Sequence, residues 1–384
     1  MMDVSGVIEN IEYHKQNVLE RRVRRPGIPE LDQLPQRHEQ WKLLKATLAK
    51  TRHDQQGAGL EALIAKTEDE RKVALKRASE IKQFIHSQEQ HLNGLDRFVQ
   101  GVAISLPNIT HRDVPVGPEP CAVIKSKHGP EPIPPSELRD HASIMESLDM
   151  VEFKAASTVV GGSWYYLRGA GALLETALTN YALSVAIEHG WEPFTTPDAI
   201  RTDIALRCGF QPRDVNTAGS EEVHHFYHLE HTSGDLVLSG TAEIPFAGLY
   251  ANQTFTEQDM AKRFPIKMAG VGHAFRSEAG ARGKGTRGLY RVHQFTKVEL
   301  FALTGEEASE GFMEEMLSLQ QEIFSGLGFP YRCVMRGFQC RSSADSLHRV
   351  LDMPTEELGA AAHRKYDIEA WMPGRGGWGE VKSI

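Results

Sequence analysis

Residues 275–299 read FRSEAGARGKGTRGLYRVHQFTKVE and give the strongest prediction of local structure in the chain. The two ends of this segment are typical of strands, and its middle is rich in glycine and basic residues, so we expect a hairpin with a flexible loop. Side chains two residues apart lie on the same face of a strand, so Arg276 and Glu278 should project together. On the residues alone, an ordinary surface hairpin with paired charges is the alternative interpretation.

The glycine-rich loop does not fit a Walker-type phosphate loop. Such a loop requires Gly-Lys-Ser/Thr after four spacers, and here Gly283-Lys284 is followed by Gly285. The two projecting side chains nevertheless suit a nucleotide, because an arginine fork matches a phosphate and a carboxylate can accept a hydrogen bond from an adenine amino group.

Short strands alternate with loops through the C-terminal half of the chain. An apolar helical pattern runs from Gly171 to His189, and a second helix is expected at about 306–326. Because few helices separate the strands, we expect an α+β fold built on an antiparallel sheet and not a doubly wound parallel one. The expected strands are Trp191–Pro197, Leu236–Ser239, Met268–Arg276, His293–Phe301, Tyr331–Met335 and Tyr366–Trp371.

The N-terminal part has the pattern of a helical hairpin. There is no proline between Pro35 and Pro107, and Gly57 and Gly59 suggest a single break. We predict antiparallel helices at 30–55 and 60–99, the second roughly 60 Å long. The facing residues of the second helix step by 4 and 3 as in a heptad seam, opposite a stripe on the first: Ala74, Ala78, Ile81, Ile85, Gln88, Leu92, Leu95 and Val99, opposite Leu31, Leu34, Trp41, Leu44 and Leu48.

The composition is ordinary for a globular protein. Lys and Arg total 43 against 51 acidic residues, a formal charge of −8, so any nucleic-acid contact must come from local basic patches. No apolar run approaches the roughly 20 residues that span a bilayer, and no membrane contact is expected. The four cysteines lie far apart without a C-x-x-C pair, which favours a reducing intracellular compartment.

Residues 107–140 contain eight prolines and are typical of an extended linker. The chain therefore divides into a helical hairpin arm at 1–106, a Pro-rich linker at 107–140 and a mixed core at 141–384. Taken alone, the lysines and arginines of the arm fit the solvated surface of a coiled coil.

Residues 275–299 resemble the second signature motif of class II aminoacyl-tRNA synthetases, in the form found in seryl-tRNA synthetases. Three further segments resemble the same family: SGTAEIP at 239–245 its serine-recognition segment, RKYDIEAWMP at 364–373 the strand before its third motif, and the helix and strand ending at Pro197 its first, dimer-forming motif. The hairpin corresponds to the family's tRNA-binding arm, so the resemblance covers nearly the whole chain. It implies an antiparallel class II catalytic domain with an N-terminal coiled-coil arm, and serine–tRNA ligase activity.

The resemblance also implies roles for individual residues. Arg276 would hold the α-phosphate of ATP and Glu278 the adenine, and Arg276 and Glu380 would be the catalytic residues. Glu380 would also hold Mg²⁺. The residues implied for serine are Thr241, Ala242, Glu243 and Glu299, and those implied for ATP are Arg276, Ser277, Glu278, Val292, Glu380, Val381, Lys382 and Ser383.

The cofactors implied by the resemblance are ATP and Mg²⁺, and the partners are serine, tRNA(Ser) and a second copy of the chain. In this context the lysines and arginines of the arm would contact tRNA phosphates. The bacterial-like arm favours the mitochondrial matrix over the cytoplasm as the compartment.

Family members continue past Glu380 through an Asn-Cys-Thr segment and a third motif that holds the γ-phosphate, whereas this sequence ends at Ile384. From this we expect poor stability and little or no aminoacylation. An incomplete gene model and a real short isoform both fit the ending. The alternative function is a catalytically impaired form that acts as a tRNA-binding or dimerisation protein.

Two clusters stay open. The histidines 224, 225, 228 and 231 have spacings that suit a metal, but no acidic or cysteine ligand stands at a familiar zinc interval, so a loop or strand rim is preferred. The four arginines around Val23 fit an import or RNA-contacting cluster and a basic helix end equally well.

Overall fold

The computed structural model describes residues 3–23, 27–210, 226–230, 234–277, 288–329, 331–333 and 350–384. The chain forms two compact units, residues 1–109 and residues 110–384. Each unit has a hydrophobic core of its own.

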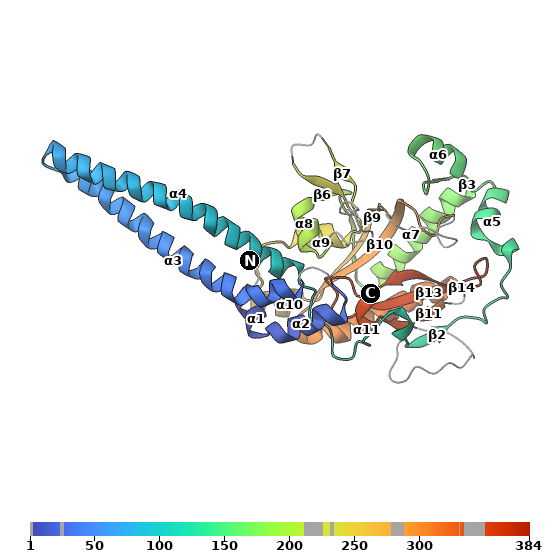
Figure 1. The fold of residues 1–384 in the computed structure, drawn as a ribbon. Helices are drawn as coiled ribbons and strands as arrows, with labels where there is room; N and C mark the ends of the chain where they lie inside the picture. Colours follow the sequence, from blue (N-terminus) through green and yellow to red (C-terminus); the bar gives the residue numbers. More distant parts are fainter. Residues whose placement is uncertain are drawn as a thin grey trace. The chain divides into compact units, whose positions relative to one another are not determined.

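The first unit is dominated by two long helices, α3 (Ile28–Ile64) and α4 (Glu68–Ser105). Figure 1 shows them side by side and antiparallel, so the predicted helical hairpin is confirmed. Both predicted stripes supply buried residues to the seam between the helices. From the first helix these are Leu31, Leu34 and Leu48, and from the second Ala74, Ile85, Leu95 and Val99.

The position predicted for the break between these helices is wrong. Gly57 and Gly59 lie inside α3, and the chain turns at residues 65–67. Thr67 begins α4 with a capping box: its side chain accepts from the N–H of Glu70, while its own N–H donates to the Glu70 carboxylate at 3.0 Å. The turn lies at Thr67 because the capping box there gives hydrogen-bond partners to the N–H groups of Thr67 and Glu70. The two glycines inside α3 do not end that helix.

Two short helices, α1 (Val4–Glu9) and α2 (Ile11–Glu20), were not predicted from the sequence. Their apolar residues Val4, Val7 and Val18 join Leu31 and Val99 in the core of the first unit. Residues near the chain start thus pack against the base of the hairpin.

The second unit is built on a six-stranded antiparallel sheet in the order β1-β12-β13-β11-β2, with β14 pairing β13. Its strands include two short ones from the segment predicted as a linker, β1 and β2, which pair with β12 and β11. The bounds are β1 Val123–Ile124, β2 Ser126–His128, β11 Tyr331–Cys333, β12 Val350–Asp352, β13 Tyr366–Met372 and β14 Gly377–Ser383.

A three-stranded sheet contains the hairpin predicted at residues 275–299. Strands β9 (Ile266–Phe275) and β10 (Gln294–Leu303) pair antiparallel along their whole length, and β5 (Glu192–Thr195) pairs β9 in parallel. Helices α7 (Ala170–Glu188) and α11 (Ser309–Gly326) pack on these strands through Trp191, Ala269 and Phe312.

The remaining elements are short. Sheets β6-β8-β7 and β3-β4 are antiparallel, so the predicted α+β fold is confirmed, with β5–β9 as its one parallel pairing among the described strands. The bounds are β3 Val151–Glu152, β4 Tyr166–Leu167, β6 Ala199–Arg201, β7 His228–Leu229, β8 Leu236–Leu238, α5 His141–Ser147, α6 Phe153–Val160, α8 Thr202–Arg207, α9 Glu243–Leu249 and α10 Glu257–Arg263; 3₁₀ turns lie at residues 119–121, 137–139, 306–308 and 355–357.

Helix α7 leaves an apolar face uncovered. Leu173 is 72% exposed, and Leu174, Leu178 and Ile187 are exposed as well. Among the described helices, α7 has the length and apolar composition to cross a membrane, but a single helix of this kind is weak evidence for a span. These residues form an exposed apolar surface on α7.

Candidate active site

Thr241, Lys297 and Glu299 meet in a buried polar cluster. The Thr241 hydroxyl donates to Oε2 of Glu299, and the Lys297 ammonium lies 2.5 Å from the same oxygen and 3.0 Å from Oγ1 of Thr241. Thr241 is 3% exposed and Glu299 is 8% exposed. A carboxylate so deeply buried requires such partners, since its charge is otherwise costly to remove from water.

The backbone around Thr241 is tied to the neighbouring strand. The hydroxyl of Ser239 donates to the carbonyl of Thr241 at 2.6 Å, and the carbonyl of Ser239 accepts from the N–H of Phe275 at 2.9 Å. Ala242 is buried and precedes α9, whose first residue is Glu243. The structure therefore brings together the four residues predicted for serine: Thr241, Ala242, Glu243 and Glu299.

Arg276 lies where β9 ends, at the start of the loop. Its N–H donates to the carbonyl of His293 at 2.9 Å, and its guanidinium lies over the ring of Phe295 at 5.1 Å. The His293 ring is stacked on Trp164 and lies 2.7 Å from the hydroxyl of Tyr227. The arginine is thus held at its backbone by a hydrogen bond and at its guanidinium by a cation–π contact.

The other residues predicted on this hairpin are described in part. Ser277 follows Arg276 directly, and Val292 is 6% exposed. Glu278 lies outside the described residues. The histidines 224, 225 and 231 and the arginines 24 and 25 also lie outside them, so the two open clusters stay open.

The C-terminal candidates lie on β14. Glu380 pairs with Glu369 of β13 across the sheet, and the hydroxyl of Ser383 donates to Oε1 of Glu380 at 2.6 Å. Val381 is 40% exposed, and the side chain of Lys382 lies outside the described atoms. A carboxylate oxygen is a ligand that Mg²⁺ accepts, so Glu380 fits the metal that the resemblance implies, and Ser383 is its hydrogen-bond partner.

A buried ion pair lies beside these residues. The Lys365 ammonium is 2.8 Å from Oδ2 of Asp367, which is 1% exposed and faces Ser383 in the strand pairing. Burial, and then the nearby charge of Glu380, raise the pKa of Asp367 to about 6, although Lys365 acts in the opposite direction. The Lys365 ammonium compensates the charge of Asp367, so this pair adds no net negative charge beside Glu380.

Tyr290 connects β14 with the returning arm of the hairpin. The Arg375 guanidinium, in the turn between β13 and β14, lies over the Tyr290 ring at 4.3 Å. A Cβ atom on Gly379 would lie 3.0 Å from the Tyr290 hydroxyl. Because Glu380 follows Gly379, the strand that bears it borders the segment that follows the Arg276 loop.

Three residues at the site were missed by sequence reasoning. Lys297 had a signal in the sequence, since it shares a strand face with Glu299 at a spacing of two. His141 and Tyr290 had none, because their contacts join segments that are far apart in the chain: His141 accepts from the N–H of Leu289, and Tyr290 lies under the guanidinium of Arg375.

Residues 227–384 match the family model described as tRNA synthetase class II core domain (G, H, P, S and T). The chain is 37% identical over 386 residues to a serine–tRNA ligase of Rubrobacter xylanophilus, covering all of this chain and 82% of the relative. It is 42% identical over 287 residues to a mitochondrial serine–tRNA ligase of Schizosaccharomyces pombe, covering 73% of this chain and 54% of the relative.

Solved structures agree with the sequence relatives. Seryl-tRNA synthetase from Pyrococcus horikoshii, complexed with ATP, superposes with a TM-score of 0.76 at 29% identity, covering all of this chain and 83% of that one. A cytoplasmic serine–tRNA ligase from Naegleria fowleri in complex with AMP superposes with a TM-score of 0.71 at 25% identity, covering 97% and 80%.

Proposed function

The chain belongs to the serine–tRNA ligase family, a class II synthetase family, and from this premise we propose that it activates serine with ATP and transfers it to tRNA(Ser). The observation that supports this function best is the polar cluster in which Thr241, Lys297 and Glu299 meet. It offers a buried carboxylate and hydroxyl to a small amino acid that has an ammonium group and a hydroxyl of its own.

In this proposal Thr241, Ala242, Glu243 and Glu299 surround serine. Glu299 pairs with the substrate ammonium, and a second polar group of the pocket bonds the substrate hydroxyl. Ala242 packs with Phe246 and Met268 and fixes the turn into α9 beside the pocket. Alanine lacks the hydroxyl and would leave a buried polar group unpaired, at a cost of about 1–3 kcal/mol.

ATP binds along the hairpin, with Arg276 on its α-phosphate, Ser277 and Glu278 near the adenine and Val292 beside the nucleotide. A serine carboxylate oxygen attacks the α-phosphorus, pyrophosphate leaves, and seryl-adenylate forms. A ribose hydroxyl at the tRNA terminus then attacks the carbonyl carbon, and AMP leaves. Arg276 acts in this chemistry through its positive charge, which stabilises the transferring phosphoryl group, and it neither gives nor takes a proton.

Glu380 would hold Mg²⁺, with Val381, Lys382 and Ser383 beside it at the ATP site. When bound, the metal neutralises phosphate charge. The hydrogen bond from Ser383, at 2.6 Å, orients the Glu380 carboxylate.

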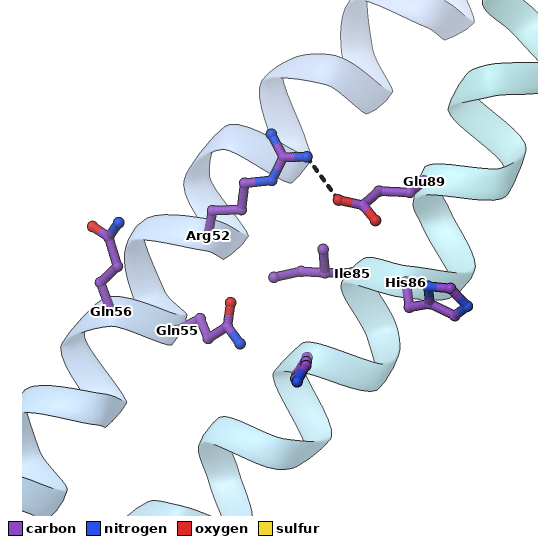
Figure 2. Close-up of a pocket in the computed structure, with 7 residues that line it drawn as sticks. Arg52, Gln55, Gln56, Ile85, His86 and Glu89 are labelled. Carbon is purple, nitrogen blue, oxygen red and sulfur yellow. Dashed lines mark hydrogen bonds and ion pairs between the residues drawn. The ribbon is translucent and has the colours of Figure 1, made fainter.

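The helical hairpin would bind tRNA through its basic side chains. Midway along it, α3 and α4 form a hollow of about 380 Å³, lined by Arg52, Gln55, Gln56, Lys82, Ile85, His86 and Glu89. Figure 2 shows Arg52 and Glu89 joined across the two helices, with both glutamine amides on α3. Cationic and amide donors suit phosphate and sugar oxygens, which position a nucleic acid without reading its bases.

A homodimer would cover the apolar face of α7. Leu173, Leu174, Leu178 and Ile187 form an exposed apolar surface that a water-facing helix does not maintain without a partner. The same helix resembles the dimer-forming motif of the family, so we assign its occupant as a second copy of the chain.

The mitochondrial matrix is the compartment that we propose, ahead of the cytoplasm. The relatives include mitochondrial enzymes at 41–43% identity and bacterial enzymes at 33–42% identity, so the preference rests on the resemblance of the arm. Immunofluorescence of the native protein against a matrix marker tests the assignment, and a diffuse cytoplasmic signal would overturn it.

The function is tested by ATP–pyrophosphate exchange on the purified protein with serine, alanine and threonine. Exchange with serine, and not with alanine or threonine, would support the proposed function and contradict the loss of activity expected from the sequence. Absence of exchange from folded protein that still binds tRNA would support the non-catalytic alternative instead. Charging of tRNA(Ser) with labelled serine tests the second step.

A further inference from the structure

Lys297 lies in the candidate serine site but has no role in the function proposed above. Lys297 and Glu299 alternate along β10 and share one face, and the ammonium lies 2.5 Å from Glu299 Oε2. The same ammonium donates to Thr241 Oγ1 at 3.0 Å. Lys297 therefore contacts both side chains on which the proposed recognition of serine depends.

These contacts fix the direction of the Thr241 hydroxyl. A protonated lysine only donates hydrogen bonds, so Oγ1 of Thr241 accepts from it and must send its own hydrogen elsewhere. That hydrogen goes to Oε2 of Glu299. The donor order runs from Lys297 to Thr241 to Glu299, and it leaves neither the hydroxyl nor the carboxylate free to rotate.

The charges of the pocket give Lys297 a second effect. Glu299 is buried, so its negative charge is costly without a partner. The Lys297 ammonium lies against this carboxylate and offsets that cost. Without the ammonium, the charge balance around the carboxylate proposed to pair with the substrate changes.

We propose that Lys297 is a positioning residue that sets the affinity and selectivity of the pocket for serine. The proposal rests on the proposed serine-activating function. Lys297 acts through Thr241 and Glu299, and its loss leaves a mobile hydroxyl and an excess negative charge where serine binds. Charge-assisted hydrogen bonds contribute about 1.5–3 kcal/mol, which corresponds to roughly a 10-fold to 100-fold change in binding.

The test compares K297M, which keeps the length of the side chain but has no charge or donor, with K297R, which keeps the charge. K267M is the matched control, because Lys267 on β9 also pairs with a carboxylate, Glu315, at 2.6 Å. Serine-dependent ATP–pyrophosphate exchange gives KM for serine, KM for ATP and kcat for each variant, and alanine and threonine measure selectivity.

We expect K297M to raise KM for serine about tenfold or more and to reduce selectivity, with KM for ATP within about twofold of the wild type. K297R should restore part of the affinity, and K267M should match the wild type. A serine KM within twofold of the wild type in K297M overturns the proposal. So do equal losses in both Lys297 variants with a lowered melting temperature, which indicate a role in folding alone.

Calorimetric titration with L-serine separates failure of this inference from failure of the proposed function. If the wild type shows no serine-dependent exchange, the proposed function fails, and binding then decides the role of Lys297. Serine binding by the wild type that is lost in K297M supports the inference, and equal binding or no binding by both proteins overturns it.

Discussion

The backbone N–H of Leu289 donates a hydrogen bond to Nε2 of His141 at 2.9 Å. This contact joins the start of α5 to the segment that leads into β10, 148 residues later in the chain. Gly288, the preceding residue, has a φ of +73° and lies so close that an added Cβ would be 2.4 Å from the same nitrogen. His141 therefore fixes the backbone at Leu289, where the chain leads back into β10. Position 288 requires glycine, because a side chain there would collide with the His141 ring.

Gly288→Ala should displace this anchor, because alanine is strained at positive φ and its methyl collides with the imidazole. We expect a loss of about 1–3 kcal/mol in stability and a several-fold rise in KM for ATP. Thermal unfolding and pyrophosphate exchange measure the two effects. Gly305→Ala is the control, since nothing lies within 4 Å of its Cβ position; equal behaviour of the two variants would contradict the assignment.

Arg276→Ala should lower kcat for serine-dependent exchange by about 10²–10³-fold, because a fixed charge on the transferring phosphoryl group is lost. Lysine keeps the positive charge of Arg276 but not the planar guanidinium with its paired donors. Arg276→Lys should therefore recover only part of the rate. Arg263→Ala is a matched control, since its guanidinium also lies over a phenylalanine ring, that of Phe255, at 5.5 Å. A loss of similar size in Arg263→Ala would show that stacking and not phosphate contact explains the effect.

The fold was predictable from the sequence wherever periodicity or a strand–loop–strand pattern is strong. The seam from Ala74 to Val99 and the strand pair β9–β10 are examples. The turn at residues 65–67 was also present in the sequence as the Thr67–Glu70 capping box. It was missed because Gly57 and Gly59 suggested an earlier break, although two glycines at about 1 kcal/mol each do not interrupt a long, packed helix.

The candidate site was predictable as a set of residues but not as a geometry. The resemblance selected Thr241 and Glu299, and their contact confirms that the structure brings them together. The part played by Lys297 depends on the conformation of the loop after β8 and on the strand face that β10 presents. The spacing of two between Lys297 and Glu299 predicts their shared face, but local pattern does not encode the approach of Thr241 from the loop after β8. The anchor of Leu289 on His141 is less local still.

Replacing Leu174 or Leu178 on α7 by glutamate should convert the proposed dimer into a monomer. In the dimer the glutamate carboxylate would be buried without a positively charged partner. Removing that charge from water costs free energy, whereas burying the original leucine is favourable. Light scattering coupled to size exclusion measures the mass of each variant. Leu138→Glu is the control, because Leu138 is 89% exposed and lies outside α7; a monomeric wild type would contradict the dimer directly.

The base of the helical hairpin should lose stability as the pH falls below about 6.5, the ordinary pKa of histidine. Burial lowers the pKa of His14 on α2, whose Nδ1 has no hydrogen-bond partner among the described residues. Burial, and then the charge of Lys42, lower the pKa of His38 on α3 in the same direction. The unfolded chain thus takes up protons before the folded one does, and stability is full above the unfolded pKa and declines as the pH falls through it.

Hydrogen exchange measured by mass spectrometry, corrected for intrinsic rates, should therefore show less protection of α2 at pH 5.5 than at pH 7.5. His14→Leu should reduce this difference without removing it, because His38 still contributes. His53→Gln, at an exposed position on α3, is the control and should leave the difference unchanged. If His14→Leu retains the full loss of protection, the buried imidazole of His14 is not its source, and the acid sensitivity must come from His38 alone.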